Sequence, residues 1–278
     1  MKEIVNMRNL PNVSIFVVHY SKLKDRRVYL EQNLNKNGIL GEWVTEENFI
    51  DFQNSSFKTP EIFGISAKLI GMDLGVNSRS LVFSRRRARF QGYSLYVRSF
   101  FAREGNTLTT GSLPQRKILP KSQLEIQRMH LTALQRGVEK STEWILVLED
   151  DAIPTSEAWQ VLDGITQGVV LGNIWMNLNS GAGLKRTSTD PSPNQYGLFR
   201  VKPAATKCAT AYLVSRNLAI QILALAKVHG IPEWLPIDLV FQAALRKLKA
   251  KAYWQEPETF IQGSETGSYQ SNLDGRRY

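Results

Sequence analysis

The chain has 278 residues, a mass of 31.5 kDa and 42% apolar residues. This length and composition suffice for one large domain or two small ones with a packed core, and they argue against disordered and fibrous classes. No apolar run approaches the roughly 18 residues that span a bilayer, and the first residues lack the apolar stretch of a secretory signal. We therefore expect a soluble, cytoplasmic protein.

The positive charge is concentrated in one segment. The chain carries 35 Lys and Arg against 25 Asp and Glu, a formal net charge of +10. Residues 51–122 contain twelve basic and four acidic residues, which accounts for +8 of that total. A basic segment of this kind suits nucleic acid, an anionic membrane surface or a phosphorylated ligand as partner.

Cys208 is the single cysteine of the chain. An intrachain disulfide framework and a cysteine-based zinc cluster are therefore excluded. We expect Cys208 to be a small, buried apolar residue with no role as a nucleophile.

The N-terminal part is predicted to form a strand, a loop and a helix. Residues 13–19, VSIFVVH, are an apolar, β-branched run typical of a buried strand. Asp25 is expected to cap the following helical pattern, RRVYLEQNLNKN, which ends at Gly38. A second strand is predicted near Trp43. Residues 51–121 then form a basic insertion for which the pattern indicates no clear structure.

Regular patterns return at Ser122, where the residues SQLE fit a capping box. That helix is expected to end near Gly137, and the apolar run at 143–148 to form a central strand covered on both faces. The remaining predicted elements are strands around Trp175 and Tyr212, a loop at 179–193, and helices at 217–229 and 237–248. This alternation predicts an α/β fold, a mixed sheet flanked by helices in a single domain over 1–278, with 51–121 inserted.

Three carboxylates follow the predicted central strand directly: Glu149, Asp150 and Asp151. Ligands of open α/β sheets gather beyond the carboxyl ends of the strands, so this position indicates a binding site. Adjacent carboxylates repel one another and are stable only in water, beside basic side chains or around a divalent cation. The alternative is a solvated acidic turn that caps a helix starting near Thr155.

The run LVLEDDAIP resembles the strand and acidic motif of metal-dependent glycosyltransferases with the GT-A fold. Three further blocks resemble glycosyltransferase family 25, the lipopolysaccharide-type and collagen-type galactosyltransferases. They are VVHYSKLKDRRVYLEQNLNKNGI, ATAYLVSRNLAIQIL and LPIDLVF. The four blocks keep the family's order and span most of the chain, whereas 50–121 matches none of it. The resemblance implies a GT-A-like, Rossmann-like fold and the transfer of a sugar.

The resemblance also implies a role for each acidic residue. Asp151 would ligate Mn²⁺ or Mg²⁺ that bridges the diphosphate of a nucleotide-sugar donor. Glu149 and Asp150 would contact the ribose, the transferred sugar or water around the metal. The chemical need is a hard cation that neutralises the charge developing on the leaving diphosphate.

The end of the first strand is expected to bind the nucleotide. By the same resemblance, His19 and Tyr20 would border the base, and Arg26 or Arg27 would reach the base or the phosphates. For the two arginines, a solvated basic start of a helix is the alternative.

Asp238, at the predicted start of a helix, is our candidate catalytic base. Family 25 enzymes are regarded as inverting, and a single displacement needs a carboxylate that deprotonates the acceptor hydroxyl. Simple helix capping is the alternative for Asp238, and Glu265 is the reserve base. Glu265 belongs to the small polar stretch 262–268, which we expect to be a loop that offers backbone amides to the diphosphate or else a flexible tail.

His130 marks a departure from the family, which usually has a Ser-His pair where this chain has Met129-His130. On a helix, His130 shares a face with Ile126 and Leu134, so a structural role in the core is at least as well supported as a functional one. We therefore leave His130 out of the predicted site.

The leading hypothesis is a metal-dependent glycosyltransferase that moves galactose or another hexose from a UDP-sugar to a hydroxyl of a glycan or glycolipid. The basic segment would then contact a phosphorylated acceptor, such as a lipopolysaccharide core, or an anionic membrane, which would place the protein at the inner face of that membrane. The arginines expected to make this contact are Arg85, Arg86, Arg87 and Arg89.

Two other classes of function stay open. Arginines interleaved with aromatic residues at 79–103 suit a nucleic-acid-binding module, although this leaves the carboxylates after the strand unexplained. A two-metal phosphoryl-transfer enzyme would need further carboxylates at the same site. The phosphate-loop patterns GxxxxGK[ST] and GxGxxG do not occur in the sequence, which argues against kinases, GTPases and NAD-dependent enzymes of those types.

Overall fold

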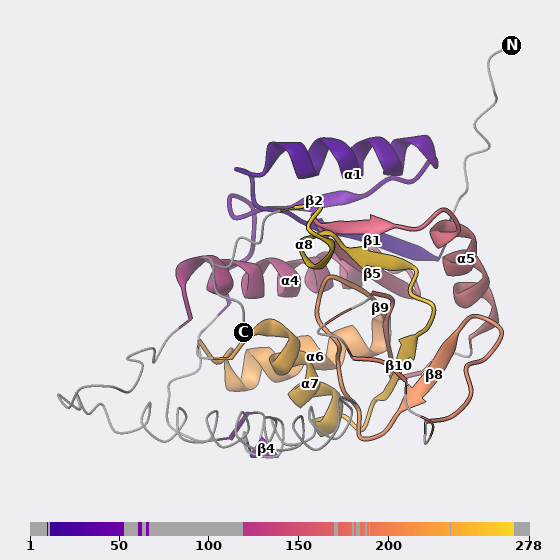
Figure 1. Ribbon diagram of the computed structural model, residues 1–278. Helices are drawn as coiled ribbons and strands as arrows, with labels where there is room; N and C mark the ends of the chain where they lie inside the picture. Colours follow the sequence, from indigo (N-terminus) through magenta and orange to yellow (C-terminus); the bar gives the residue numbers. More distant parts are fainter. Residues whose placement is uncertain are drawn as a thin grey trace, which may run out of the picture.

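The computed structural model describes residues 10, 12–52, 61–62, 65–66, 119–169, 172–179, 181, 184–186, 188, 190–233 and 235–269. Within them, a seven-stranded mixed sheet is flanked by helices (Figure 1). The predicted α/β class with a mixed sheet is therefore confirmed. Most of the basic insertion 51–121, including the segment 79–103, lies outside the described residues.

The main sheet has the strand order β2-β1-β5-β9-β7-β10-β8. Its strands are β1 (Val13–Val18), β2 (Glu42–Val44), β5 (Trp144–Glu149), β7 (Ile174–Asn177), β8 (Leu198–Val201), β9 (Ala211–Ser215) and β10 (Lys251–Gln255). β1 runs parallel to β2 and β5, and β10 runs parallel to β7, whereas β9 is antiparallel to both of its neighbours and β8 is antiparallel to β10.

Two small antiparallel sheets complete the described strands. One pairs β6 (Ala152–Pro154) with β11 (Phe260–Gln262), and the other pairs β3 (Glu61–Ile62) with β4 (Ile65–Ser66). Because β6 begins directly after the acidic residues, its pairing brings the C-terminal part of the chain to the end of β5.

The helices cover both faces of the main sheet (Figure 1). They are α1 (Lys24–Lys36), α4 (Lys121–Glu139), α5 (Ala158–Gly168), α6 (Arg216–His229), α7 (Ile237–Lys247) and the short α8 (Gly263–Thr266). Apolar residues of α1 and α5 form one core with one face of the sheet, and those of α4, α6 and α7 form a second core with the other face.

The central strand β5 shows why both cores are needed. Ile145 and Val147 pack into the core of α4, whereas Trp144, Leu146 and Leu148 pack into the core of α1 and α5, and all five are fully buried. Side chains of a strand alternate between the two faces of its sheet, so a strand that is buried on both faces reads as a continuous apolar run. This confirms the predicted buried strand for residues 144–148, whereas Glu143 is exposed and lies before β5.

Several predicted boundaries need correction. Asp25 is not the cap of the first helix, because α1 already begins at Lys24 and Asp25 lies within its first turn. The capping box at Ser122 is wrong as well: α4 begins at Lys121, and Pro120 precedes it without a side-chain cap. The predicted ends at Gly38 and Gly230 hold, since both glycines have a positive φ where the helical pattern stops.

Candidate functional site

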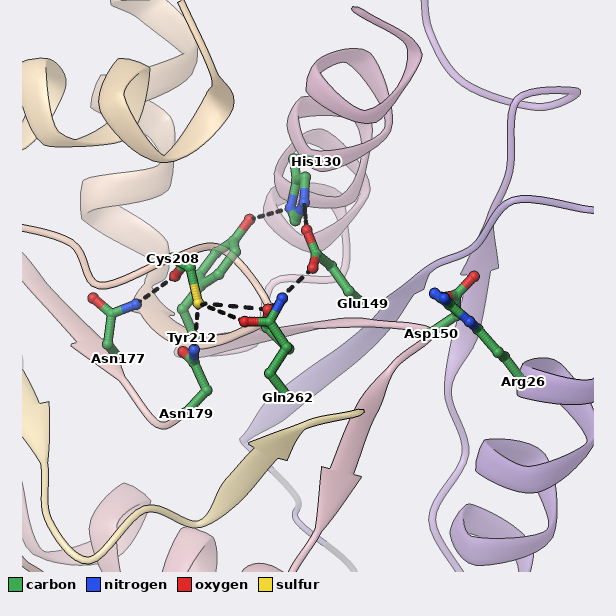
Figure 2. Close-up of polar contacts among 10 residues, drawn as sticks. Arg26, His130, Glu149, Asp150, Asn177, Asn179, Cys208, Tyr212 and Gln262 are labelled. Carbon is green, nitrogen blue, oxygen red and sulfur yellow. Dashed lines mark hydrogen bonds and ion pairs between the residues drawn. The ribbon is translucent and has the colours of Figure 1, made fainter. Parts of the chain in front are cut away.

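The ends of β1 and β5 bring the predicted site residues together. In the parallel register of these strands, Val18 lies opposite Glu149, so His19 and Asp150 follow next to each other at the same edge of the sheet. The alternation along β5 continues into the acidic residues. Glu149 contacts α4 and Asp150 contacts α1, so neighbouring carboxylates have separate sets of partners (Figure 2).

Asp150 is held by a buried set of donors. Its Oδ1 accepts a hydrogen bond from Arg26 Nη1 at 2.8 Å, and its Oδ2 lies 3.0 Å from His19 Nδ1 and 3.3 Å from the backbone N–H of Tyr20. Asp150 is 6% exposed and Arg26 is 8% exposed. An ion pair removed from water in this way is stable only when its remaining hydrogen-bonding positions are filled. Asp150 therefore joins α1, the end of β1 and the end of β5.

Tyr20 and Arg27, the other two residues predicted to contact the nucleotide, have different partners. The Tyr20 hydroxyl donates to Glu125 of α4 at 2.7 Å, and this bond, followed by burial, raises the pKa of Tyr20 to about 12. Arg27 lies over the ring of Trp43 at 4.8 Å from the ring centre, and Trp43 also meets the edge of His19 at 5.3 Å between ring centres. The two adjacent arginines thus have different environments.

Asp151 has an unsatisfied buried oxygen. The residue is 5% exposed, and among the described residues its Oδ1 has no hydrogen-bond partner. Its Oδ2 accepts the backbone N–H of Ser264 at 3.4 Å. Burial, then the nearby Glu149 and Asp150, raise the pKa of the Asp151 carboxyl to about 6. Such a carboxylate is stabilised by any positive charge placed beside it.

The C-terminal part of the described chain packs on Asp151. The backbone N–H of Gly263 donates to the carbonyl oxygen of Asp151 at 2.8 Å, and the ring of Tyr269 lies under Arg26 at 5.1 Å. A Cβ atom at position 263 would collide with the Tyr269 ring and lie 3.1 Å from the Asp151 carbonyl oxygen, so any residue other than glycine requires Tyr269 to move. The predicted loop 262–268 needs correction, because 263–266 form the short helix α8.

The acidic residues suit a metal site in which the phosphates of a substrate supply part of the coordination. In the described part of the chain, no group of three or more His, Cys, Asp or Glu side chains has the arrangement of a metal cage. Magnesium, however, is commonly held by one or two carboxylates together with substrate phosphates and water. The unpaired Oδ1 of Asp151 fits the single-carboxylate form of such a site.

Glu149 belongs to a hydrogen-bonded group that includes His130. His130 Nε2 lies 3.2 Å from Glu149 Oε1, and Thr210 Oγ1 donates to Glu149 Oε2 at 3.1 Å. His130 is fully buried, and its Nδ1 lies 3.2 Å from the hydroxyl of Tyr212 (Figure 2). His130 was left out of the predicted site, and its ring does lie in the core, but it also contacts an acidic residue of the candidate site.

Asp238 lies in the first turn of α7, where Pro236 precedes the helix without a side-chain cap. Burial of the Asp238 carboxyl group raises its pKa to about 6. Glu149 adds to this increase in pKa, whereas hydrogen bonds from backbone amides and the nearby His130 oppose it. Asp238 is therefore within electrostatic range of Glu149 and His130. Glu265, the reserve base, is in α8, but its side chain lies outside the described part of the molecule.

Cys208 is not the apolar core residue that we expected. It is half-buried, and its Sγ contacts Asn179 Nδ2 at 2.6 Å and Gln262 Oε1 at 3.6 Å. Its carbonyl oxygen accepts from Asn177 Nδ2 at 2.8 Å. Burial raises the pKa of the thiol to about 12, so Cys208 stays a neutral thiol in a polar group beside Glu149 (Figure 2). Sequence reasoning missed this group, because its members come from separate strands and loops.

A scan against protein-family models and a search of curated proteins found no match. Among the described residues, none of the helices combines the length and the apolar character that a membrane crossing requires. The site therefore has to be interpreted from its own chemistry.

Proposed function

We propose that the protein is a metal-dependent glycosyltransferase of the GT-A type, similar to family 25, that uses a UDP-sugar. The observation that carries this proposal is Asp151 Oδ1, which is buried at the carboxyl end of the central strand and has no hydrogen-bond partner among the described residues. The mixed sheet flanked by helices is compatible with a GT-A-like fold, and the site lies at the edge where ligands of open α/β sheets bind.

The charges of the site suit a diphosphate and a cation. Asp151 would hold Mn²⁺ or Mg²⁺ together with the phosphates, and when bound the cation would offset the charge that develops on the leaving diphosphate. Arg27, which lies over Trp43, offers a cationic surface to a nucleotide at the end of β1, whereas the His19 ring is buried and holds Asp150. The Glu149 side chain is 24% exposed, and its carboxylate would accept hydrogen bonds from hydroxyls of the sugar.

Asp238 is the proposed base. With a pKa of about 6 it is ionised at neutral pH, yet it accepts a proton more readily than an ordinary carboxylate. It would deprotonate a hydroxyl of the acceptor, which we propose to be a glycan or glycolipid. Its position close to Glu149 would bring the acceptor to the sugar of the donor.

The experiment that tests the proposed function is a thermal-shift titration with UDP, GDP and CMP, each with and without Mn²⁺. A ligand that binds only the native state raises the melting temperature by mass action, by an amount equivalent to about 2.7 kcal/mol at 100 times Kd. We expect a shift with UDP that requires Mn²⁺. No shift with any of the nucleotides, in a folded sample with metal present, would refute the proposal.

We predict that Asp238→Asn lowers the rate of UDP release from UDP-galactose, with water as acceptor, by about 10²- to 10⁴-fold, the range for loss of a general base. Binding of UDP with Mn²⁺ stays unchanged. Because the base works only when ionised, the rate of the unaltered protein should rise with pH up to about 6 and then level off. The matched control is Asp25→Asn, an exposed carboxylate in the first turn of α1. Equal rates in Asp238→Asn and in the control would exclude Asp238 as the base.

The basic segment remains a proposed contact with an anionic membrane or a phosphorylated acceptor, and residues 85–89 lie outside the described residues. The nucleic-acid alternative depends on that same segment. The two-metal alternative would need more free carboxylate oxygens than the described site offers, since both oxygens of Asp150 and both of Glu149 already have protein partners.

A further inference from the structure

His130 is held rigidly in the core. Its ring stacks on Tyr212 at 5.8 Å between ring centres and meets Phe241 edge-on at 6.1 Å. Tyr212 in turn stacks on Trp175 at 4.2 Å, and all four side chains are fully buried. This packing restricts the ring, and the directions of its two nitrogens follow from their partners, Tyr212 at Nδ1 and Glu149 at Nε2.

The partners of His130 determine where its proton lies. The pKa of Tyr212 is raised well above its ordinary value, chiefly by burial, so its hydroxyl keeps its hydrogen and can donate it to Nδ1 at 3.2 Å. A carboxylate only accepts hydrogen bonds, so Glu149 Oε1 needs a hydrogen on Nε2. With a proton on Nε2 the ring donates to Glu149, and its Nδ1 can accept the hydrogen of the Tyr212 hydroxyl.

Glu149 is then fixed through both of its oxygens. His130 donates to Oε1, and Thr210 donates to Oε2 while its own carbonyl oxygen accepts the backbone N–H of Glu149 at 2.7 Å. The Glu149 side chain is nevertheless 24% exposed, whereas His130 is not exposed at all. His130 and Thr210 therefore set the orientation of the carboxylate, while part of the Glu149 side chain stays exposed.

We propose that His130 is a positioning residue: with its proton on Nε2 it connects Tyr212 to Glu149 and orients the Glu149 carboxylate toward the hydroxyls of the transferred sugar. The part of this inference that concerns the sugar rests on the proposed function. The hydrogen-bonded chain from Tyr212 to Glu149 does not.

The first test is the protonation state of the His130 ring. The chain has three histidines, His19, His130 and His229, so long-range ¹H–¹⁵N spectra contain three imidazole patterns, and His130→Gln identifies the one that it removes. We expect this ring to carry its proton on Nε2 at neutral pH and its Nε2–H to exchange faster with water in Glu149→Ala. A proton on Nδ1, or an Nε2–H that does not respond to Glu149→Ala, would overturn the proposal.

The second test separates positioning from simple packing. With Mn²⁺ present, His130→Phe keeps a ring but has no N–H, and we expect it to weaken UDP-galactose binding by about 10- to 100-fold, the range for partners that orient a ligand-binding group. UDP alone should bind as before, since it lacks the sugar. His130→Gln retains an N–H donor and should lose less. His229→Gln, an exposed histidine at the end of α6, is the matched control.

The outcomes of the second test distinguish the two proposals. Equal losses of UDP and UDP-galactose in His130→Phe and His130→Gln would mean that His130 only packs the core, and the positioning role would be wrong. If the unaltered protein shows the Nε2 proton but binds neither nucleotide, the proposed function fails and the role toward a sugar falls with it. The hydrogen-bonded chain would then stand as a device that orients Glu149 for another ligand.

Discussion

Asp151→Asn should abolish the Mn²⁺-dependent binding of UDP and at the same time stabilise the protein without ligands. The substitution removes the anionic oxygen offered to the cation, but it keeps the size of the side chain and an acceptor for the Ser264 N–H. The two effects have opposite signs because the same buried charge that attracts a cation destabilises the protein when no cation is bound.

The pH dependence follows from the raised pKa of Asp151. A carboxyl group whose pKa is about 6 in the folded protein and 3.8 otherwise binds a proton more tightly in the folded state. Its contribution to the free energy of unfolding therefore falls between about pH 4 and pH 6 and is unfavourable by about 2–3 kcal/mol above that window. Asp151→Asn removes this dependence, and a bound cation should reduce it.

Urea denaturation at several pH values, with and without UDP and Mn²⁺, measures both effects. Asp163→Asn in α5, a helix that packs on the sheet through its own apolar face, is the control for the loss of a single carboxylate. If Asp151→Asn were less stable than the unaltered protein at neutral pH, the carboxylate would be structural. Retained UDP and Mn²⁺ binding in Asp151→Asn would remove Asp151 from the proposed metal site.

The sequence predicted most of the elements that form the centre of the sheet. β1, β5, β7 and β9 are apolar and buried on both faces, and such runs are visible without a structure. Among the strands that follow the basic insertion, β6, β8, β10 and β11 were not predicted from the sequence. In β10, KAYWQ, the mixture of polar and aromatic residues has no clear period, and only the first residue, Lys251, is exposed. β6 and β11 are three residues each and are defined by pairing with each other.

The site was predictable where it depends on strand ends and not where it depends on tertiary packing. Residues that follow β1 and β5 had to meet at one edge, because parallel strands end on the same side, and His19 and Asp150 do so. The partners of Glu149 are His130 in α4 and Thr210, the residue before β9. A local sequence pattern does not show how close these residues lie to β5 in space. A histidine on an apolar helix face, such as His130, becomes informative only once a carboxylate is seen beside it.

Arg26→Met should cause the largest loss of stability among single substitutions at this site. Methionine fills the space of the arginine stem but leaves Asp150 as a buried carboxylate without its cationic partner. Breaking a buried ion pair by removal of one member typically costs about 3–5 kcal/mol, because the remaining charge is uncompensated. His19 and the backbone N–H of Tyr20 are the only other donors to Asp150 among the described contacts, so they cannot replace the lost charge unless His19 becomes protonated.

A double-mutant cycle with Asp150→Asn tests this explanation. If the cost of Arg26→Met comes from the uncompensated carboxylate, the double substitution Arg26→Met with Asp150→Asn should be more stable than Arg26→Met alone, which gives a coupling energy of about 0.5–3 kcal/mol. The matched control is Arg27→Met, because Arg27 is adjacent, exposed and stacked on Trp43 without a carboxylate partner in the described contacts. Urea midpoints at constant slope are measured for the four proteins of the cycle and for the Arg27→Met control. If Arg26→Met and Arg27→Met had equal midpoints, the Arg26 to Asp150 pair would not anchor α1 to the end of β5, and the position of the nucleotide-facing residues on α1 would need another explanation.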